Sequence, residues 1–103
     1  MKTFAENLAA LPTLDHLTAL RLQDAHGVLQ ATIENKPGTR GSFRVYHFVA
    51  NKWSGLGLEA AQEALELFAE HTADAKLHPG KHPNIDRLFE IVEKTSHFTV
   101  EVS

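Results

Sequence analysis

The sequence predicts an α+β fold, in which a small antiparallel sheet of three strands is covered on one face by about four helices. Apolar and polar residues alternate with a period of two in three short segments, and apolar residues recur at helical spacing in the longer ones. The expected strands are 17–23, 28–34 and 97–102, and the expected helices are 4–11, 43–53, 58–74 and 83–94. A chain of 103 residues has the size of one domain, so we expect a single domain over residues 1–103.

The first helix is predicted from its two ends. Thr3 and Glu6 have the spacing of a capping box, and Pro12 cannot continue a helix. Phe4 and Leu8 fall on one face of the segment between them. The sequence therefore predicts a short amphipathic helix at the start of the chain.

The next two elements are predicted to form a hairpin. Residues 24–27 (DAHG) have turn chemistry and separate the alternating segments 17–23 and 28–34. The segment 97–102 alternates in the same way, as a half-buried strand does. We expect this last strand to join the hairpin in one sheet.

The segment 43–53 is assigned to a helix, although its β-branched and aromatic residues would also permit a strand. The residues before it, 35–41, are rich in turn formers, and Ser42 is a good N-cap residue. Gly55 supplies a stop signal. These two end signals favour the helix.

Two amphipathic helices are predicted in the second half of the chain. The apolar face of 58–74 is continuous, and Pro83 suits the first turn of a second helix. The face of the first of these helices comprises Leu58, Ala61, Leu65, Phe68 and Thr72.

Composition excludes several classes of function. The net charge is −3 and the basic residues are not clustered, so no nucleic-acid interface and no basic membrane-surface helix is expected. The chain has no cysteine, which excludes disulfides and thiolate metal sites. Glu6 interrupts the N-terminus where a signal peptide needs an apolar core, and no apolar run approaches the roughly 20 residues of a membrane span. We therefore expect a cytoplasmic protein.

Residues 70–87 (EHTADAKLHPGKHPNIDR) contain three of the seven histidines and two of the four prolines. His71, Asp74 and His78 would share a face of an unbroken helix, and imidazole and carboxylate groups are ordinary ligands of divalent metals. Pro79, however, disfavours a helical conformation at His78, and helix ends also account for these residues. Helix capping is therefore preferred over a metal site, and no cofactor is predicted.

Two glycine-containing segments are also candidates for function. Residues 38–42 (GTRGS) precede a predicted helix, where backbone N–H groups and Arg40 would suit an anion. A turn followed by an N-cap explains the same residues. Residues 55–60 (GLGLEA) match a dinucleotide-binding pattern, but no parallel βαβ unit surrounds them. We interpret these glycines as a turn between two helices.

The sequence resembles two families. Over residues 41–89 it is similar to the HopJ type III effector family, most specifically at His82-x-Asn84-Ile85 after a Pro-Gly turn. Over residues 1–100 it resembles a family of short bacterial proteins of unknown function, through its NKPG, GS, VYH, LELFAEHTADA and HPGKHPNIDRLF segments. The resemblances imply a bacterial origin and support the fold, and neither supplies a catalytic residue.

The function predicted from the sequence is that of a small binding module whose working surface is the inter-helix loop 70–87. Its partner would be a protein or a small molecule, and a homodimer is also considered. The predicted surface residues are His71, Asp74, His78, His82, Asn84, Tyr46 and His47. A metal-assisted enzyme using His71, Asp74, His78 and His82 is the first alternative, and a HopJ-like effector is the second.

Overall fold

The sheet has the strand order β2-β1-β3 in the computed structural model, which describes residues 2–103. Its strands are β1 (Ala19–Gln23), β2 (Leu29–Glu34) and β3 (Thr99–Val102), and both neighbouring pairs are antiparallel. The hairpin turn is closed by Asp24, whose Oδ1 accepts hydrogen bonds from the N–H groups of His26 and Val28. The prediction that the C-terminal strand joins the hairpin is confirmed, because β3 pairs with β1.

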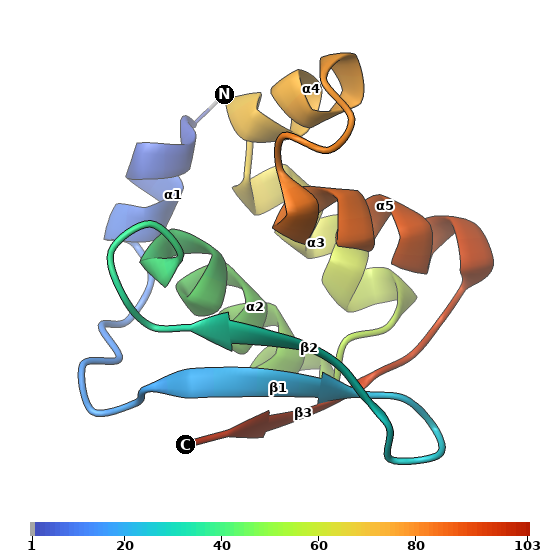
Figure 1. Ribbon diagram of the computed structural model, residues 1–103. Helices are drawn as coiled ribbons and strands as arrows, with labels where there is room; N and C mark the ends of the chain where they lie inside the picture. Colours follow the sequence, from blue (N-terminus) through green and yellow to red (C-terminus); the bar gives the residue numbers. More distant parts are fainter. Residues whose placement is uncertain (1) are drawn as a thin grey trace.

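Among residues 2–103 there are five helices, and they lie on one face of this sheet (Figure 1). They are α1 (Phe4–Ala9), α2 (Arg40–Trp53), α3 (Leu58–Leu67), α4 (Glu70–Leu77) and α5 (Pro83–Lys94). The α+β prediction is thus confirmed, with five helices in place of about four. Within residues 2–103, none of these helices has the length and apolar character needed to cross a membrane.

The hydrophobic core lies between the sheet and the helices. Leu20 and Leu22 of β1 are fully buried, because alternate residues of a strand point to the same side of the sheet. They pack in one cluster with Phe43 and Val49 of α2 and Leu88 of α5. The alternation in the sequence therefore identified the buried side of the central strand correctly.

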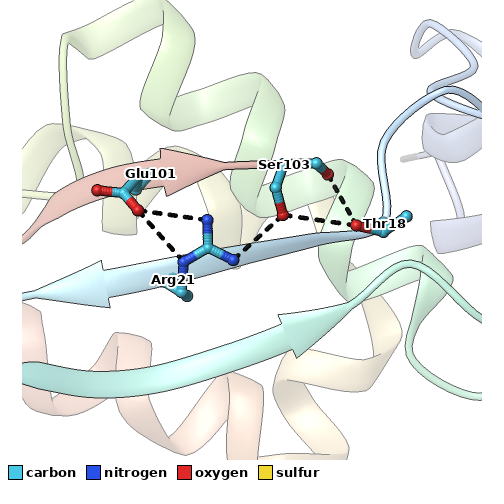
Figure 2. A network of polar contacts seen from close by, with 4 residues as sticks. All are labelled: Thr18, Arg21, Glu101 and Ser103. Atoms are coloured by element: carbon cyan, nitrogen blue, oxygen red, sulfur yellow. Dashed lines mark hydrogen bonds and ion pairs between the residues drawn. The ribbon is translucent and has the colours of Figure 1, made fainter.

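The opposite face of the sheet carries a network of polar side chains (Figure 2). Arg21 on β1 pairs with Glu101 on β3 at 3.3 Å, and its Nη1 donates to Ser103 Oγ at 3.2 Å. Thr18 Oγ1 donates to the carbonyl oxygen of Ser103 at 3.0 Å. This pattern is typical of an antiparallel sheet with one side in solvent.

The prediction of one continuous helix over 58–74 is wrong, because the structure has two helices in this segment, α3 and α4. Ala69 adopts φ 50° and ψ −117°, which ends the helical path without a glycine or proline. The break lets Glu70 Oε1 accept the N–H of Phe4 at 2.8 Å, and Asn7 Nδ2 donate to the carbonyl of Leu67 at 2.9 Å. The carbonyl of Leu67 thus receives a donor from α1 at the break, and Glu70 in turn binds the first N–H of α1.

The start of α2 also differs from the prediction. The helix begins at Arg40, so Ser42 lies inside its first turn and is not the N-cap. Thr39 occupies the N-cap position, but its hydroxyl donates to the carbonyl of Glu34 at 2.7 Å and makes no cap bond. The first N–H groups of α2 therefore have no side-chain partner among the described residues.

The turn between α2 and α3 explains the two glycines of the GLGLEA segment. Gly55 has φ 132°, and a Cβ atom placed there would lie 2.7 Å from His97 Cε1. A Cβ atom at Gly57 would lie 2.8 Å from His97 Cδ2. Leu56 between them exchanges two backbone hydrogen bonds with Phe98. The glycines thus admit the imidazole of His97, in agreement with the turn interpretation.

Candidate functional site

A pocket of about 520 Å³ lies where α2 and α5 begin, beside α1. Residues 38–42 form one part of its lining and residues 81–85 form another. Phe4, Leu8, Phe68 and His71 complete it. The fold therefore brings together two segments that are separate candidates in the sequence.

Backbone donors from two helices line this pocket. In the part of the chain that the structure describes, no side chain caps the N-terminus of α2 or of α5. The N–H groups of Gly41, Ser42 and Asn84 have no hydrogen-bond partner among residues 2–103. The first turn of a helix also carries partial positive charge from the helix dipole. Both helix starts therefore favour negative charge in the pocket.

The floor of the pocket is apolar and aromatic. The rings of Phe4 and Phe68 stack with centroids 5.3 Å apart, and His71 meets Phe4 edge-on at 4.9 Å. Gly41 lets α1 approach α2 closely, because a Cβ atom there would lie 3.0 Å from Phe4 Cζ. A flat or apolar chemical group would find matching surface here.

The charged side chains of the lining are all basic or imidazole groups. Arg40, Lys81, His71 and His82 belong to it, whereas none of its residues within the described chain is an aspartate or glutamate. This distribution contrasts with the net charge of −3 of the whole chain. The lining thus offers cationic and imidazole groups but contributes no carboxylate of its own among the described residues.

Asp74 does not line the pocket, but its carboxylate contacts two residues that do, Lys81 and His82. Its Oδ2 lies 2.6 Å from His82 Nε2 and 3.1 Å from Lys81 Nζ, and its Oδ1 lies 3.8 Å from His78 Nε2. The hydrogen bond with His82, followed by that with Lys81, lowers the pKa of Asp74. Asp74 therefore stays ionised at neutral pH and ties α4 to the start of α5.

The structure does not gather the four proposed metal ligands at one point. The ring of His71 packs against Phe4 and lies 5.7 Å from the ring of His82. The ammonium group of Lys81 pairs with the carboxylate of Asp74, so a metal ion would have to compete with Lys81 for this ligand. Within residues 2–103, no group of three histidine, aspartate or glutamate side chains is arranged to hold a metal ion.

Tyr46 is a buried residue behind the pocket, although it was predicted to lie on the working surface. Its hydroxyl donates to the backbone carbonyl of Asn84. Arg87 Nη1 donates to the same hydroxyl at 3.2 Å and to Asn84 Oδ1 at 2.8 Å. Burial raises the pKa of Tyr46 to about 12, although Arg87 opposes the rise. Tyr46 therefore links α2 to α5 through its hydroxyl and presents no surface to solvent.

His47 points to another part of the molecule. Successive residues of a helix diverge by about 100°, so Tyr46 and His47 cannot face the same way. His47 stacks on Phe43 with ring centroids 6.2 Å apart and lines a groove beside β3. Burial, and then the nearby His16, lower the pKa of His47. The predicted surface is thus divided between two sites.

Sequence reasoning did not predict that Phe4, Leu8 and Phe68 would meet the loop 70–87. Their spacing assigned them to the buried faces of helices, and helical periodicity does not say which helix they will contact. Arg87 was also missed as a partner of Tyr46. Only the three-dimensional arrangement reveals both relationships.

The chain belongs to a bacterial protein family. Residues 4–102 match the family described as "Uncharacterized protein conserved in bacteria (DUF2322)". The match confirms the resemblance to a bacterial family of unknown function, and no comparison supports the resemblance to HopJ. Neither a curated protein nor a solved structure matches the sequence.

Proposed function

We propose that this member of a bacterial family is a binding module for a small organic anion, held in the pocket between α1, α2 and α5. The observation that carries the proposal is the meeting of two uncapped helix starts in a lining with basic side chains and no carboxylate among its described residues. Oriented N–H groups and helix dipoles favour an anion at such a position. The loop 70–87 contributes one side of the site.

The pocket also suggests the shape of the ligand. A carboxylate or phosphate group would lie at Gly41, Ser42 and Asn84, and an apolar or aromatic portion would lie on Phe4 and Phe68. The volume of about 520 Å³ is within the range of small-molecule sites, which is about 300–1,000 Å³. A small molecule is favoured over a protein partner here, because the lining is concave and its donors converge.

Four probes of related size test this proposal. Benzoate and phenyl phosphate carry both an anionic group and a ring, benzyl alcohol carries only the ring, and inorganic phosphate carries only the charge. We expect benzoate or phenyl phosphate to shift the backbone amide resonances of Gly41, Ser42 and Asn84 in a saturable titration. The other two probes should bind more weakly. Equal shifts from benzyl alcohol and benzoate would contradict an anion site.

Two variants that each remove one positive charge distinguish the effect of a charge in the pocket lining from that of a charge elsewhere on the protein. Arg40→Ala removes a charge from the lining, whereas Lys36→Ala removes the same charge from the neighbouring loop, where Lys36 pairs with Glu34 at 3.3 Å. Hydrogen bonds to charged groups contribute about 1.5–3 kcal/mol, so Arg40→Ala should weaken benzoate binding about tenfold or more. Lys36→Ala should leave it nearly unchanged. The same loss in both variants would mean that the pocket is not the site.

A further inference from the structure

The outer edge of β3 carries backbone groups that face away from the sheet. Ser103 exchanges two backbone hydrogen bonds with Ala19, next to β1, at 3.3 and 3.0 Å. Because hydrogen-bonded pairs alternate along an antiparallel ladder, Glu101 and Thr99 also direct their N–H and C=O groups towards β1. The residues between them direct these groups outwards. Phe98 uses its outward groups to pair with Leu56, at 2.9 and 3.0 Å. Within residues 2–103, those of Val100 and Val102 have no backbone partner.

A groove follows this edge. It has a volume of about 370 Å³, and its walls come from β3 and from the C-terminal half of α2. Val100 and Val102 form one wall, and His47, Ala50 and Asn51 form the other. Val102 is 40% exposed, which is high for a valine whose register partner, Leu20, is fully buried. The groove therefore offers apolar surface beside unpaired backbone groups.

The chain begins a strand at this edge but does not continue it. Leu56 pairs with Phe98 in the antiparallel sense, which would place Ser54 opposite Val100 if the extended chain continued. Ser54 instead ends α2 with φ 57°. The position of a fourth strand beside Val100 and Val102 is therefore not filled by the residues that the structure describes.

We propose that this edge binds an extended peptide segment of a partner protein, which adds to the sheet as an antiparallel strand next to β3. Two residues of the peptide would exchange backbone hydrogen bonds with Val100 and Val102. Their side chains would point into the groove towards His47 and Ala50, because directly opposed residues share a face of the sheet. Peptide binding by strand addition combines backbone bonds of this kind with pockets for alternate side chains.

The negative charge of Glu101 restricts the sequence of the peptide that would bind. The peptide residue between the two paired positions would lie opposite Glu101 on the polar face of the sheet. Glu101 is exposed and pairs with Arg21 at 3.3 Å. A lysine or arginine at this peptide position would gain a cross-strand ion pair, whereas a glutamate would be repelled. The preferred peptide thus has apolar residues on both sides of a basic residue.

The same charge argues against a second copy of the chain as the occupant. Pairing two β3 edges about a two-fold axis would place Val100 opposite Val102 of the other copy. Glu101 would then lie directly opposite its own equivalent, and like charges in that position are destabilising. Moving the axis towards Thr99 would collide with the segment at Leu56, which already occupies the edge. Moving it to Val102 would leave Val100 without a partner among the described residues of the second copy. A different protein is therefore the better partner.

Three synthetic peptides test the proposal. The parent is acetyl-Thr-Val-Lys-Val-Thr-amide, whose two valines would pair with Val100 and Val102. The second has N-methyl groups on both valines, which removes the donors that face β3. The third has them on the lysine and the last threonine, which removes donors that face solvent. Loss of two hydrogen bonds of about 1 kcal/mol each should weaken the second peptide about tenfold or more, while the third should bind like the parent.

Nuclear magnetic resonance of the isotope-labelled protein gives the readout. The amides of Val100 and Val102 should exchange rapidly with solvent in the free protein and become protected when the parent peptide binds. The amide of Glu101 should be protected in both states, because it faces β1. Equal affinity of the two methylated peptides, or no binding of the parent at millimolar concentration, would overturn the proposal.

Two further measurements decide the partner. Glu101→Gln should reduce the preference for the parent over a peptide with glutamate in place of lysine, and an unchanged preference would contradict the assigned register. Sedimentation of the protein without peptide should show no concentration-dependent association. A dimer with protected Val100 and Val102 amides would assign the edge to a second copy and overturn the proposal.

Discussion

The hydroxyl of Tyr46, in the middle of α2, donates a hydrogen bond to the backbone carbonyl of Asn84, in the first turn of α5. Both helices begin at the pocket, so this bond holds the two helix starts in a fixed relation. Arg87 donates to both Tyr46 and the side chain of Asn84, which adds a second link. A buried core residue therefore shapes the site without lining it.

Replacing Tyr46 with phenylalanine tests this link. The Tyr46→Phe variant keeps the ring in the core but removes the hydrogen bonds of the hydroxyl with the carbonyl of Asn84 and with Arg87, which should lower the free energy of unfolding by about 1–3 kcal/mol. Urea denaturation measures this change. Benzoate binding should also weaken in buffer without urea, where the variant remains folded. Unaltered stability would show that the bond makes no net contribution to the stability of the fold.

The ionisation of Tyr46 gives a second test that needs no variant, because the chain has a single tyrosine. The phenol should titrate in the folded protein with a pKa of about 12, and near its ordinary value of 10.0 in the urea-unfolded chain. The unfolded state therefore loses this proton first, and stability should fall as the pH rises through the window between these values. Phenolate absorbance measures both pKa values. Equal values would contradict the burial of the hydroxyl.

The sequence was sufficient to predict the helices and strands but not the contacts between them. Alternation around Leu20 and Leu22 and the end signals of the helices depend on local physical rules, so they predicted the strands and most helix ends. The break at Ala69 is accompanied by contacts with α1, a helix that is remote in the sequence. The pocket likewise arises where α1 meets two helix starts, and no local pattern encodes that meeting.

The break itself predicts a stabilising substitution. Ala69 has φ 50° and ψ −117°, a conformation that glycine adopts much more readily than alanine. Ala69→Gly should therefore raise the free energy of unfolding by about 1 kcal/mol. Ala73→Gly is the matched control, because Ala73 is an exposed residue inside α4, and it should destabilise by a similar amount. Destabilisation by both changes would argue against strain at Ala69.

Asp74 is expected to restrain the anion affinity of the pocket. Asp74→Asn removes the carboxylate that pairs with Lys81 and His82, so both become available to a bound anion. We expect benzoate affinity to rise several-fold at low salt and less at high salt. Glu93→Gln changes the same charge at an exposed site on α5 outside the pocket lining and should have little effect.

The lowered pKa of Asp74 also predicts how the stability of the protein changes in acid. Because the folded-state pKa of Asp74 is lowered by His82 and Lys81, its contribution to stability is complete above the ordinary aspartate pKa. That contribution is lost as the pH falls through the lowered value. The stability difference between the wild type and Asp74→Asn should therefore shrink in strong acid. A difference that is constant with pH would show that the ion pairs do not stabilise the fold.

The two glycines beside His97 should respond differently to alanine, because only one of them is constrained by its backbone. At Gly55, φ is 132°, which an L-residue rarely adopts, so Gly55→Ala should cost about 1–3 kcal/mol of stability whatever the neighbouring side chain does. At Gly57, the added methyl group meets only the imidazole of His97, which is exposed and can move. Adding His97→Ala should therefore recover the stability lost in Gly57→Ala and leave that of Gly55→Ala low. Urea denaturation of the four variants measures the difference, and rescue of both glycine variants would mean that contact with His97, and not φ, requires the glycine at residue 55.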